Sequence, residues 1–292
     1  MVDRTAGNPD NALRMTKQKI RQQFSEIVVC DEHQLELDRA ALLLAAEEYP
    51  HLEIEHYLNQ LDTFAEVAKA RDDIHADPLS RIMWLNHLLF GELEFCGNTK
   101  NYYDVRNSFL NEVIDRRLGI PITLSVIYIE VARRIGLTLF GVGLPGHFLV
   151  KYSDQAQEIF VDPFHGGRIL TVDHCREMIA EMYDGRIKFQ PAFLRAVTKK
   201  QILARMLQNL KGIYSQAMDH HKTLGVIEQL LLITPNSPTE IRDRGIAGLA
   251  TKCYVQARAD LEEYLRRAPM AEDASEIKKQ ISQLRQRQAQ LN

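Results

Sequence analysis

The chain has 292 residues, of which 45% are hydrophobic and 26% are charged, and its formal net charge is -3. These values are typical of a globular protein with one large or two ordinary domains, and they give no electrostatic reason to expect nucleic acid or an anionic membrane as a partner. The four cysteines, at positions 30, 96, 175 and 253, are far apart and form no CxxC pair, which argues against a zinc site and against a disulfide framework.

The N-terminal residues carry no recognisable targeting signal. The stretch MVDRTAGNPDNALRMTKQKI is polar and lacks the apolar segment of a signal peptide. No run of 18 apolar residues occurs elsewhere, so no membrane-spanning helix is expected. Because the cysteine pattern also suits a reducing compartment, these features predict a cytoplasmic protein without a membrane partner.

The N-terminal part of the sequence predicts a layer of helices. Residues 1–15 are polar and contain Gly, Pro and Asn, so they are predicted to form a flexible tail. Apolar residues then recur at helical spacing in four segments, residues 16–29, 35–48, 53–70 and 78–95. The stretch GNTKNYYDVRN, residues 97–107, is rich in turn formers and predicts a connection.

Two further helices are predicted around Gly119. The segment SFLNEVIDRRLG predicts a helix for which Gly119 is the left-handed residue after the last turn. Pro121 suits the first turn of the next helix, where a missing N–H is tolerated. That helix, PITLSVIYIEVARRI, is apolar on almost every side and is therefore predicted to be central. Arg133 and Arg134 at its end are predicted to be solvated.

The sequence after Gly136 predicts a small antiparallel sheet. Three short runs, LTLFGVGL, HFLVKY and EIFVDPF, are rich in β-branched or aromatic residues and are separated by turn formers. Alternation places His147 and Leu149 on one face of their strand and Phe148 and Val150 on the other. The predicted fold class is therefore α+β, with helices gathered against one face of a small sheet.

Beyond Pro191 only helices are expected, and an internal repeat is visible in two consecutive segments, one ending at Pro235 and the next at Pro269. The distance between these prolines is the period of tetratricopeptide repeats, with Gly245 and Ala257 at positions where two helices pack closely. Gly248 departs from the pattern, because it replaces the usual aromatic residue. The last segment predicts a capping helix through its apolar residues Ala274, Ile277, Ile281 and Leu284.

These patterns predict a tail over residues 1–15, a core domain over residues 16–190 and a helical repeat domain over residues 191–292. The repeat domain is predicted to bind a protein partner whose identity the sequence does not reveal. No nucleic-acid partner, cofactor or metal site is predicted. In particular, His51 and His56 are five residues apart and do not share a helix face, which argues against zinc binding there.

His147 and Asp162 are the candidate catalytic residues. A histidine on one strand and a carboxylate on the next can form a base with its orienting partner, and a nearby helix N-terminus at Pro121 completes part of an acyl-transfer site. His165, in the turn FHGG, is a further candidate for the same cavity. Asn107 precedes a helix, so it is either an N-cap or a pocket residue.

This arrangement resembles the transglutaminase-like superfamily, whose core is shared with papain-like proteases. The segments RRLGIPITLSVIYIEVARRIGL, VGLPGHFLVKY and VDPFHGG, followed by tetratricopeptide units, resemble more narrowly the bacterial SirB-type transglutaminase-like family. The resemblance implies a papain/transglutaminase-like core in which a cysteine begins the central helix. It also implies that His147 is the base and that Asp162, before Pro163, is the third member of the triad.

The chain departs from that pattern at the nucleophile. When the family's segment is aligned on Gly136, the cysteine position falls near Pro121, and no cysteine occurs between positions 96 and 175. Thr123 and Ser125 lie about one turn into the helix, but hydroxyls inside helices commonly bond back to a carbonyl. The position of the nucleophile is therefore left without a thiol.

Two function classes are consistent with these observations. The favoured one is a degenerate, non-catalytic binding or regulatory protein, whose pocket residues are predicted to be Asn107, Pro121, Thr123, Ser125 and His165. The alternative is a hydrolase or an amide- or acyl-transferring enzyme that uses the hydroxyl of Thr123 or Ser125 with His147 and Asp162. A structural scaffold without any ligand is a third, plainer possibility.

Overall fold

The computed structural model describes residues 9–291, and the side chains of residues 17–286 within them. The chain forms two compact units, Met1–Met206 and Leu207–Asn292, and the domain limits drawn from the sequence stay predictions. The helices of the first unit, including the one that continues into the second, are α1 Pro9–Val29, α2 Leu37–Ala46, α3 Ile54–Lys69, α4 Pro78–Asn86, α5 Leu110–Arg116, α6 Pro121–Arg134, α7 Val172–Met182 and α8 Lys199–Gln216.

The predicted N-terminal helical layer is present. The first helix begins at Pro9 and not at Thr16, because proline is well suited to a first helical turn, so part of the predicted tail is helical. The rest of that tail, residues 1–8, lies outside the described residues. The fourth predicted helix changes its winding halfway, since α4 is followed by a π-helical turn at His87–Glu92.

The helix before the central one ends differently from the prediction. It is Arg117, and not Gly119, that takes the left-handed conformation after α5, with φ of 59°. Gly119 lies instead in the two-residue strand β2 (Leu118–Gly119), which pairs in parallel with β1 (Cys96–Gly97). A Cβ at Gly119 would lie 2.9 Å from side-chain atoms of Leu124 and Val113. Close packing is therefore what requires glycine at this position.

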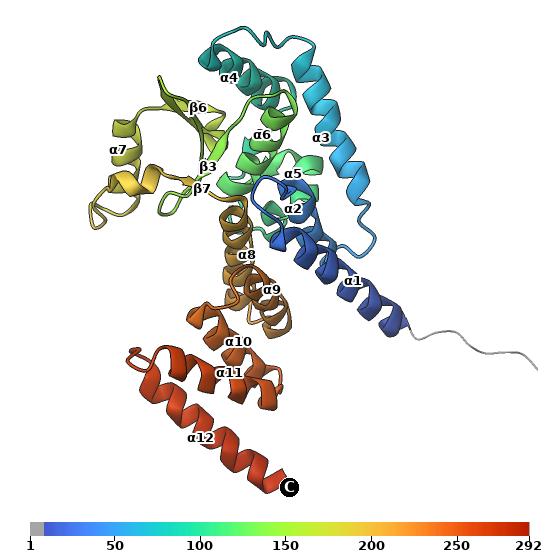
Figure 1. Cartoon of the computed structure of the whole chain (residues 1–292), viewed down its shortest axis with the longest axis vertical. Coiled ribbons are helices and arrows are strands. Elements are labelled where there is room, and N and C mark those ends of the chain that lie inside the picture. Colours follow the sequence, from blue (N-terminus) through green and yellow to red (C-terminus); the bar gives the residue numbers. More distant parts are fainter. Residues whose placement is uncertain (1–8, 292) are drawn as a thin grey trace, which may run out of the picture. The chain divides into compact units, whose positions relative to one another are not determined.

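The predicted antiparallel meander is confirmed and is larger than expected. The sheet has the strand order β6-β5-β4-β3-β7 and every pairing is antiparallel. In Figure 1 it lies between α7 on one side and α6 on the other. The strand β7 lies beyond Pro191, where only helices were predicted. The strands are β3 Phe140–Val142, β4 Leu149–Ser153, β5 Glu158–Asp162, β6 Arg168–Leu170 and β7 Ala196–Val197.

The helix α6 is central, as predicted. Every residue from Pro121 to Ala132 is buried, including the hydroxyl-bearing ones. The opposite face of the sheet packs against α7 through a cluster that includes Leu149, Phe160 and Ile179. Burial of these apolar side chains on both faces stabilises the sheet, at about 25 cal/mol per Å² of apolar surface removed from water.

The end of α6 carries a partly buried ion network that was not predicted. Arg134 bonds to Asp38 (2.6 Å), Glu130 (2.9 Å) and Asp62 (2.6 Å), and its side chain is 12% exposed. The prediction that both arginines are solvated is therefore wrong for Arg134, whereas the side chain of Arg133 is 53% exposed. The network joins α6 to α2 and α3, because Asp38 and Asp62 belong to those helices.

The second unit has the predicted repeat period. Its helix α11 (Tyr254–Arg267) begins and ends 34 residues after α9 (His220–Ile233) begins and ends. Pro235 and Pro269 are also 34 residues apart, so the helices repeat with the period seen in the sequence. They alternate with α10 (Pro238–Ala250) and end in α12 (Ala274–Leu291). The predicted capping helix is confirmed, since Ile277, Ile281 and Leu284 of α12 pack on Leu261 and Tyr264 of α11.

Glycine at position 245 is expected to be required by helix packing. A Cβ there would lie 2.8 Å from Leu261 Cδ2, so Gly245→Ala is expected to lower the free energy of unfolding by about 1–3 kcal/mol. Gly212→Ala is the matched control, because nothing lies within 4 Å of a Cβ in that helix, and it is expected to stabilise by up to about 1 kcal/mol. Urea titration of the full chain measures both changes; equal effects would contradict the packing argument.

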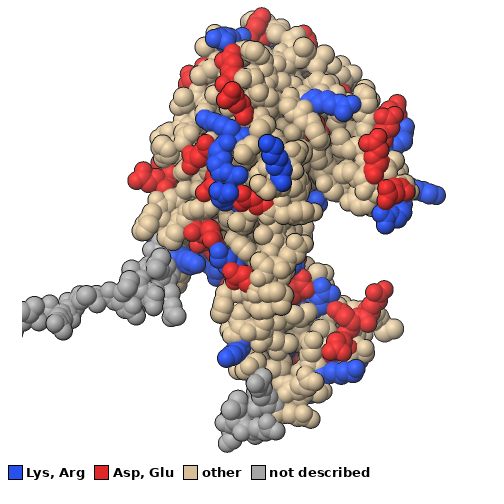
Figure 2. Space-filling view, turned by 180° about the vertical axis from the view of Figure 1, so that it is seen from behind, with Lys and Arg blue, Asp and Glu red and all other residues tan. Residues whose placement is uncertain are grey.

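None of the helices in the described part of the chain is long and apolar enough to cross a membrane. On the face shown in Figure 2, acidic and basic side chains lie beside one another. This mixture follows from the nearly balanced composition, 36 Lys and Arg against 39 Asp and Glu. This face therefore shows no cluster of basic side chains of the kind that attracts nucleic acid.

Candidate functional site

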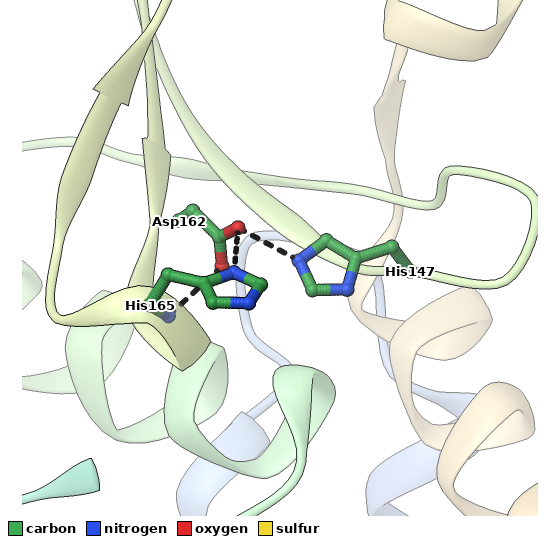
Figure 3. A group of neighbouring side chains, drawn as sticks. All are labelled: His147, Asp162 and His165. Carbon is green, nitrogen blue, oxygen red and sulfur yellow. Dashed lines mark hydrogen bonds and ion pairs between the residues drawn. The ribbon is translucent and has the colours of Figure 1, made fainter. Parts of the chain in front are cut away.

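The structure brings His147, Asp162 and His165 together. Asp162 Oδ2 lies 3.0 Å from His147 Nε2 and 2.7 Å from His165 Nδ1, and Figure 3 shows the carboxylate between the two imidazole rings. Asp162 is fully buried, His147 is 7% exposed and the His165 side chain is 55% exposed. One buried carboxylate oxygen thus serves two histidines, one enclosed and one open to solvent.

Asp162 is held in place by its own chain. It ends β5, and its other oxygen, Oδ1, accepts hydrogen bonds from the backbone amides of Phe164 (3.1 Å) and His165 (3.4 Å) in the short 3₁₀ turn Pro163–His165. Burial by itself would raise the pKa of Asp162, but the hydrogen bonds and positive charge of His147 and His165 outweigh it and lower the pKa below 3.8. The site therefore favours a carboxylate anion.

His147 stands just before its strand and not within it as predicted. It follows a turn in which Gly146 has φ of 71°, and β4 begins two residues later at Leu149. Its ring contacts those of Phe164 and His165, at centroid distances of 6.0 and 5.7 Å. Its Nε2 is the ring nitrogen that faces Asp162.

The loop that carries His165 is anchored by two residues that the sequence analysis did not select. Asn86 Nδ2 donates to the carbonyl of Gly167 (2.7 Å), and the hydroxyl of Tyr128 donates to Asn86 Oδ1 (2.8 Å). Gly167 has φ of 77°, and a Cβ there would lie 2.2 Å from Asn86 Oδ1. The sequence offers no local spacing that would single out this amide or this phenol, because the two residues lie 42 positions apart.

A cavity of about 380 Å³ opens beside the histidines. One wall comes from α7, which the sequence analysis did not predict, although Cys175, Ile179 and Met182 recur at helical spacing. The wall carries two carboxylates one helical turn apart, Glu177 and Glu181. The lining residues are His147, His165, Arg168, Leu170, His174, Glu177, Met178, Glu181 and Met182.

The predicted pocket residues at the start of α6 do not line this cavity. Thr123 is fully buried; its hydroxyl donates to the carbonyl of Asn107 (2.8 Å) and accepts from the amide of Ile120 (3.1 Å). Ser125 is also fully buried, and its hydroxyl donates to the carbonyl of Pro121 (2.7 Å). Both hydroxyls therefore satisfy backbone groups of their own neighbourhood, and neither is hydrogen-bonded to His147 among the interactions of the described residues.

Asn107 acts on the site at a distance. It is fully buried, lies in the 3₁₀ turn Val105–Ser108 and is not an N-cap. Its side chain accepts from Asn98 Nδ2 (3.0 Å) and donates to the carbonyl of Tyr102 (3.1 Å). The Tyr102 ring in turn packs edge-on against Phe164, at 5.9 Å between centroids. Asn107 thus orders the loop that supports the aromatic ring beneath the two histidines.

No thiol of the described residues replaces the missing nucleophile. Cys175 is fully buried under the sheet, and burial raises the pKa of its thiol to about 11, with a further contribution from the charge of Asp162. Cys96 is exposed, but it lies in β1 beside Gly97, whose Cβ position abuts Phe164. Because side chains alternate along a strand, Cys96 points away from that ring.

The comparisons with known proteins agree with this architecture. A family model described as transglutaminase-like superfamily matches residues 55–208, and a tetratricopeptide repeat model matches residues 210–282. A UPF0162 protein of Xylella fastidiosa (strain 9a5c) is 35% identical over 268 residues, which cover 90% of this chain and 95% of that protein. F-box only protein 21 of Mus musculus is 34% identical over 137 residues, or 44% of this chain and 21% of that protein.

Among solved structures, the chain is similar to a crystal structure of menin that reveals the binding site for Mixed Lineage Leukemia (MLL) protein. The two chains are 10% identical in sequence, the match covers 84% of this chain and 68% of menin, and the TM-score is 0.41. A score this low supports no inference about fold or function. The superfamily model, by contrast, spans more than half of the chain, and the Xylella relative spans nearly all of it. The chain therefore belongs to the transglutaminase-like superfamily and to the SirB-like UPF0162 proteins, with tetratricopeptide repeats following its core.

Proposed function

We propose that this chain is a non-catalytic transglutaminase-like protein that binds a ligand in the cavity beside His147, Asp162 and His165, and a protein partner through its tetratricopeptide repeats. One observation carries the first half of the proposal. Among the hydrogen bonds of the described residues, the ring of His147 has Asp162 as its partner and no thiol or hydroxyl. Acyl transfer through a covalent intermediate needs a nucleophile within hydrogen-bonding reach of its base.

The surroundings of α6 support this reading. Pro121, at the position where the family resemblance places a cysteine, has neither a thiol nor an N–H group. The hydroxyl of Thr123 donates to the carbonyl of Asn107 and that of Ser125 to the carbonyl of Pro121, so activating either one would first break a buried hydrogen bond, at a cost of about 1 kcal/mol. The enzyme hypothesis therefore requires a rearrangement, whereas the binding hypothesis requires none.

The cavity itself has the features of a binding site. It combines apolar residues such as Leu170 and Met178 with ionisable ones, and its lining includes His147 and His165, the two histidines that flank the buried Asp162. The carboxylates of Glu177 and Glu181 outnumber the guanidinium of Arg168 among its charged residues. A ligand with positive charge is thus favoured over an anion.

Activity-based labelling tests the absence of catalysis. The full chain is treated with fluorophosphonate and thiol-reactive amide probes, beside His147→Ala and beside His174→Ala, which changes another histidine of the same cavity. We expect no labelling that depends on His147. Labelling of Thr123 or Ser125 that disappears in His147→Ala and persists in His174→Ala would instead establish the enzyme hypothesis.

The second half of the proposal rests on the tetratricopeptide match over residues 210–282 and on the stacked helices α9 to α12. Repeats of this kind bury a continuous core between neighbours and leave extended surfaces for protein binding. Chemical cross-linking of the full chain in a cell extract, followed by mass spectrometry, is expected to join partner peptides to residues 207–286. Partner cross-links confined to the first unit would contradict this assignment.

A further inference from the structure

Three metal-ligating atoms lie together beside the cavity that His147 and His165 line. They are Nε2 of His147, Oδ2 of Asp162 and Nδ1 of His165, and all lie within 4.8 Å of one another. No second group of this kind occurs among the described residues. We infer that this cluster binds a first-row divalent metal ion such as zinc. The inference rests on the proposed ligand-binding role of the cavity and names the class of its ligand.

The three donors are close enough for one ion to reach all of them after a small outward shift. Zinc lies about 2.0–2.1 Å from a histidine nitrogen and about 2.0–2.2 Å from a carboxylate oxygen. Two such donors at the tetrahedral angle are about 3.4 Å apart, given those bond lengths. The observed separations, 3.0 Å from Oδ2 to His147 Nε2 and 2.7 Å to His165 Nδ1, are shorter than this, so zinc binding moves the rings away from the carboxylate by about half an ångström. A cation between the three atoms takes the place of the two N–H hydrogens that otherwise point at the carboxylate.

The groups around the ligands have the role of an outer shell. Asp162 Oδ1 accepts two backbone amides, which fix the carboxylate plane so that Oδ2 faces both rings. Phe164 packs edge-on against His147 and against His165, and restricts the rotation of both rings. Asn86 holds the loop that carries His165. Such partners preorganise ligands before an ion arrives.

The site is of the open kind. Three protein ligands leave at least one coordination position free, as in metal centres that bind an exogenous ligand, whereas structural zinc sites have four protein ligands. His165 is 55% exposed, and the cavity lies beside it. The donor set of two imidazoles and one carboxylate suits zinc, iron(II), cobalt(II) or manganese(II) better than calcium or magnesium.

The sequence predicts no metal site, because these residues form no local spacing motif and meet only through the sheet.

Two substitutions at position 165 separate metal binding from simple hydrogen bonding. His165→Asp places an oxygen where Nδ1 lies; this oxygen can ligate an ion but cannot donate a hydrogen bond when ionised. His165→Asn places an amide there, which can donate to Asp162 but is a poor zinc ligand. His87→Ala is the matched control outside the cavity, since the His87 side chain is 62% exposed.

Zinc titration calorimetry on the full chain, after dialysis against a chelator, is the measurement. We expect the wild type to bind one zinc ion, and His165→Asp and His87→Ala to retain this binding. In His165→Asn we expect the zinc affinity to fall at least tenfold, since loss of a residue that only supports a ligand already lowers metal affinity by about that factor. The visible spectrum of bound cobalt(II) is expected to follow the same pattern. Circular dichroism checks that each variant is folded.

The inference is overturned if the wild type binds no zinc, if His165→Asn binds as tightly as the wild type, or if His87→Ala removes the binding, which would indicate surface histidines. None of these results bears on the labelling experiment, which reports acyl transfer. Failure of the metal site and failure of the non-catalytic assignment can therefore be told apart.

Discussion

Replacement of Asp162 by alanine is expected to lower the free energy of unfolding by about 3 kcal/mol or more, because removing one partner of a buried charged group strands the other. Its carboxylate is fully buried and accepts four hydrogen bonds, from both histidine rings and from the amides of Phe164 and His165. The alanine leaves these donors without an acceptor. Urea titration at neutral pH measures the change.

Asp154→Ala is the control for this substitution. Asp154 also accepts several hydrogen bonds, from the amides of Ala156 and Gln157 and from the hydroxyl of Tyr152, but it is exposed. Water can replace the lost acceptor there, so we expect a much smaller loss than for Asp162→Ala. Equal losses for the two variants would show that burial of Asp162 is energetically unimportant.

The contribution of Asp162 has a defined pH dependence. Its pKa in the folded chain lies below 3.8, its ordinary value, so the folded state favours the anion. The stabilisation is therefore present above about pH 4 and is lost as the pH falls through the folded pKa. The difference in unfolding free energy between the wild type and Asp162→Ala is expected to shrink in acid below pH 3.8. A difference that stays unchanged there would contradict the assigned ionisation.

Replacement of Arg134 by alanine is expected to cost about 3 kcal/mol, because it removes one of the two cations that pair with two buried carboxylates. The side chains of Asp38 and Glu130 are 5% and 1% exposed and Arg134 bonds to both, while Arg133 lies 2.8 Å from Glu130 and 3.6 Å from Asp38. Arg133→Ala is the matched comparison and is expected to cost less, since the Arg133 side chain is 53% exposed and this variant keeps the more buried Arg134. Thermal and urea unfolding of the two variants distinguish them.

The effect of Arg134→Ala is expected to grow with pH. Burial raises the pKa of Glu130 from 4.5 to about 7, and the charge of Asp38 adds to this, while Arg133 and Arg134 oppose it. A raised folded pKa means that Glu130 contributes less stability as the pH rises from about 4.5 to 7. Without Arg134 the pKa rises further, so the loss extends above pH 7. A destabilisation that is the same at pH 5.5 and pH 8.5 would refute this account.

The sequence was most informative where the local pattern is strong. The repeat period predicted two consecutive helical units, with Gly245 at a position where two helices pack closely, and a Cβ there would lie 2.8 Å from Leu261. The apolar run from Pro121 predicted a central helix, and a histidine run followed by an Asp-Pro run predicted that His147 and Asp162 would meet, although His147 lies just before its strand.

Other parts of the site carried weaker signals. The wall formed by α7 was missed because its apolar residues are interrupted by the charged ones that face the cavity, such as Glu177 and Glu181. Asn86 and Tyr128 were missed because they lie 42 positions apart in different helices, and no local pattern reveals such a pair. The role of Asn107 likewise depends on Asn98 and on a loop carbonyl.

The amino-acid sequence by itself determined the class of fold, the repeat period and the absence of a cysteine at the start of the central helix, because periodicity and residue type are properties of neighbouring positions. Only the tertiary structure decided that the hydroxyl of Thr123 donates to the carbonyl of Asn107 and that His165 joins His147 at Asp162. Those facts depend on which groups meet after the sheet and helices pack, since a buried donor bonds to whichever acceptor the packing leaves within reach.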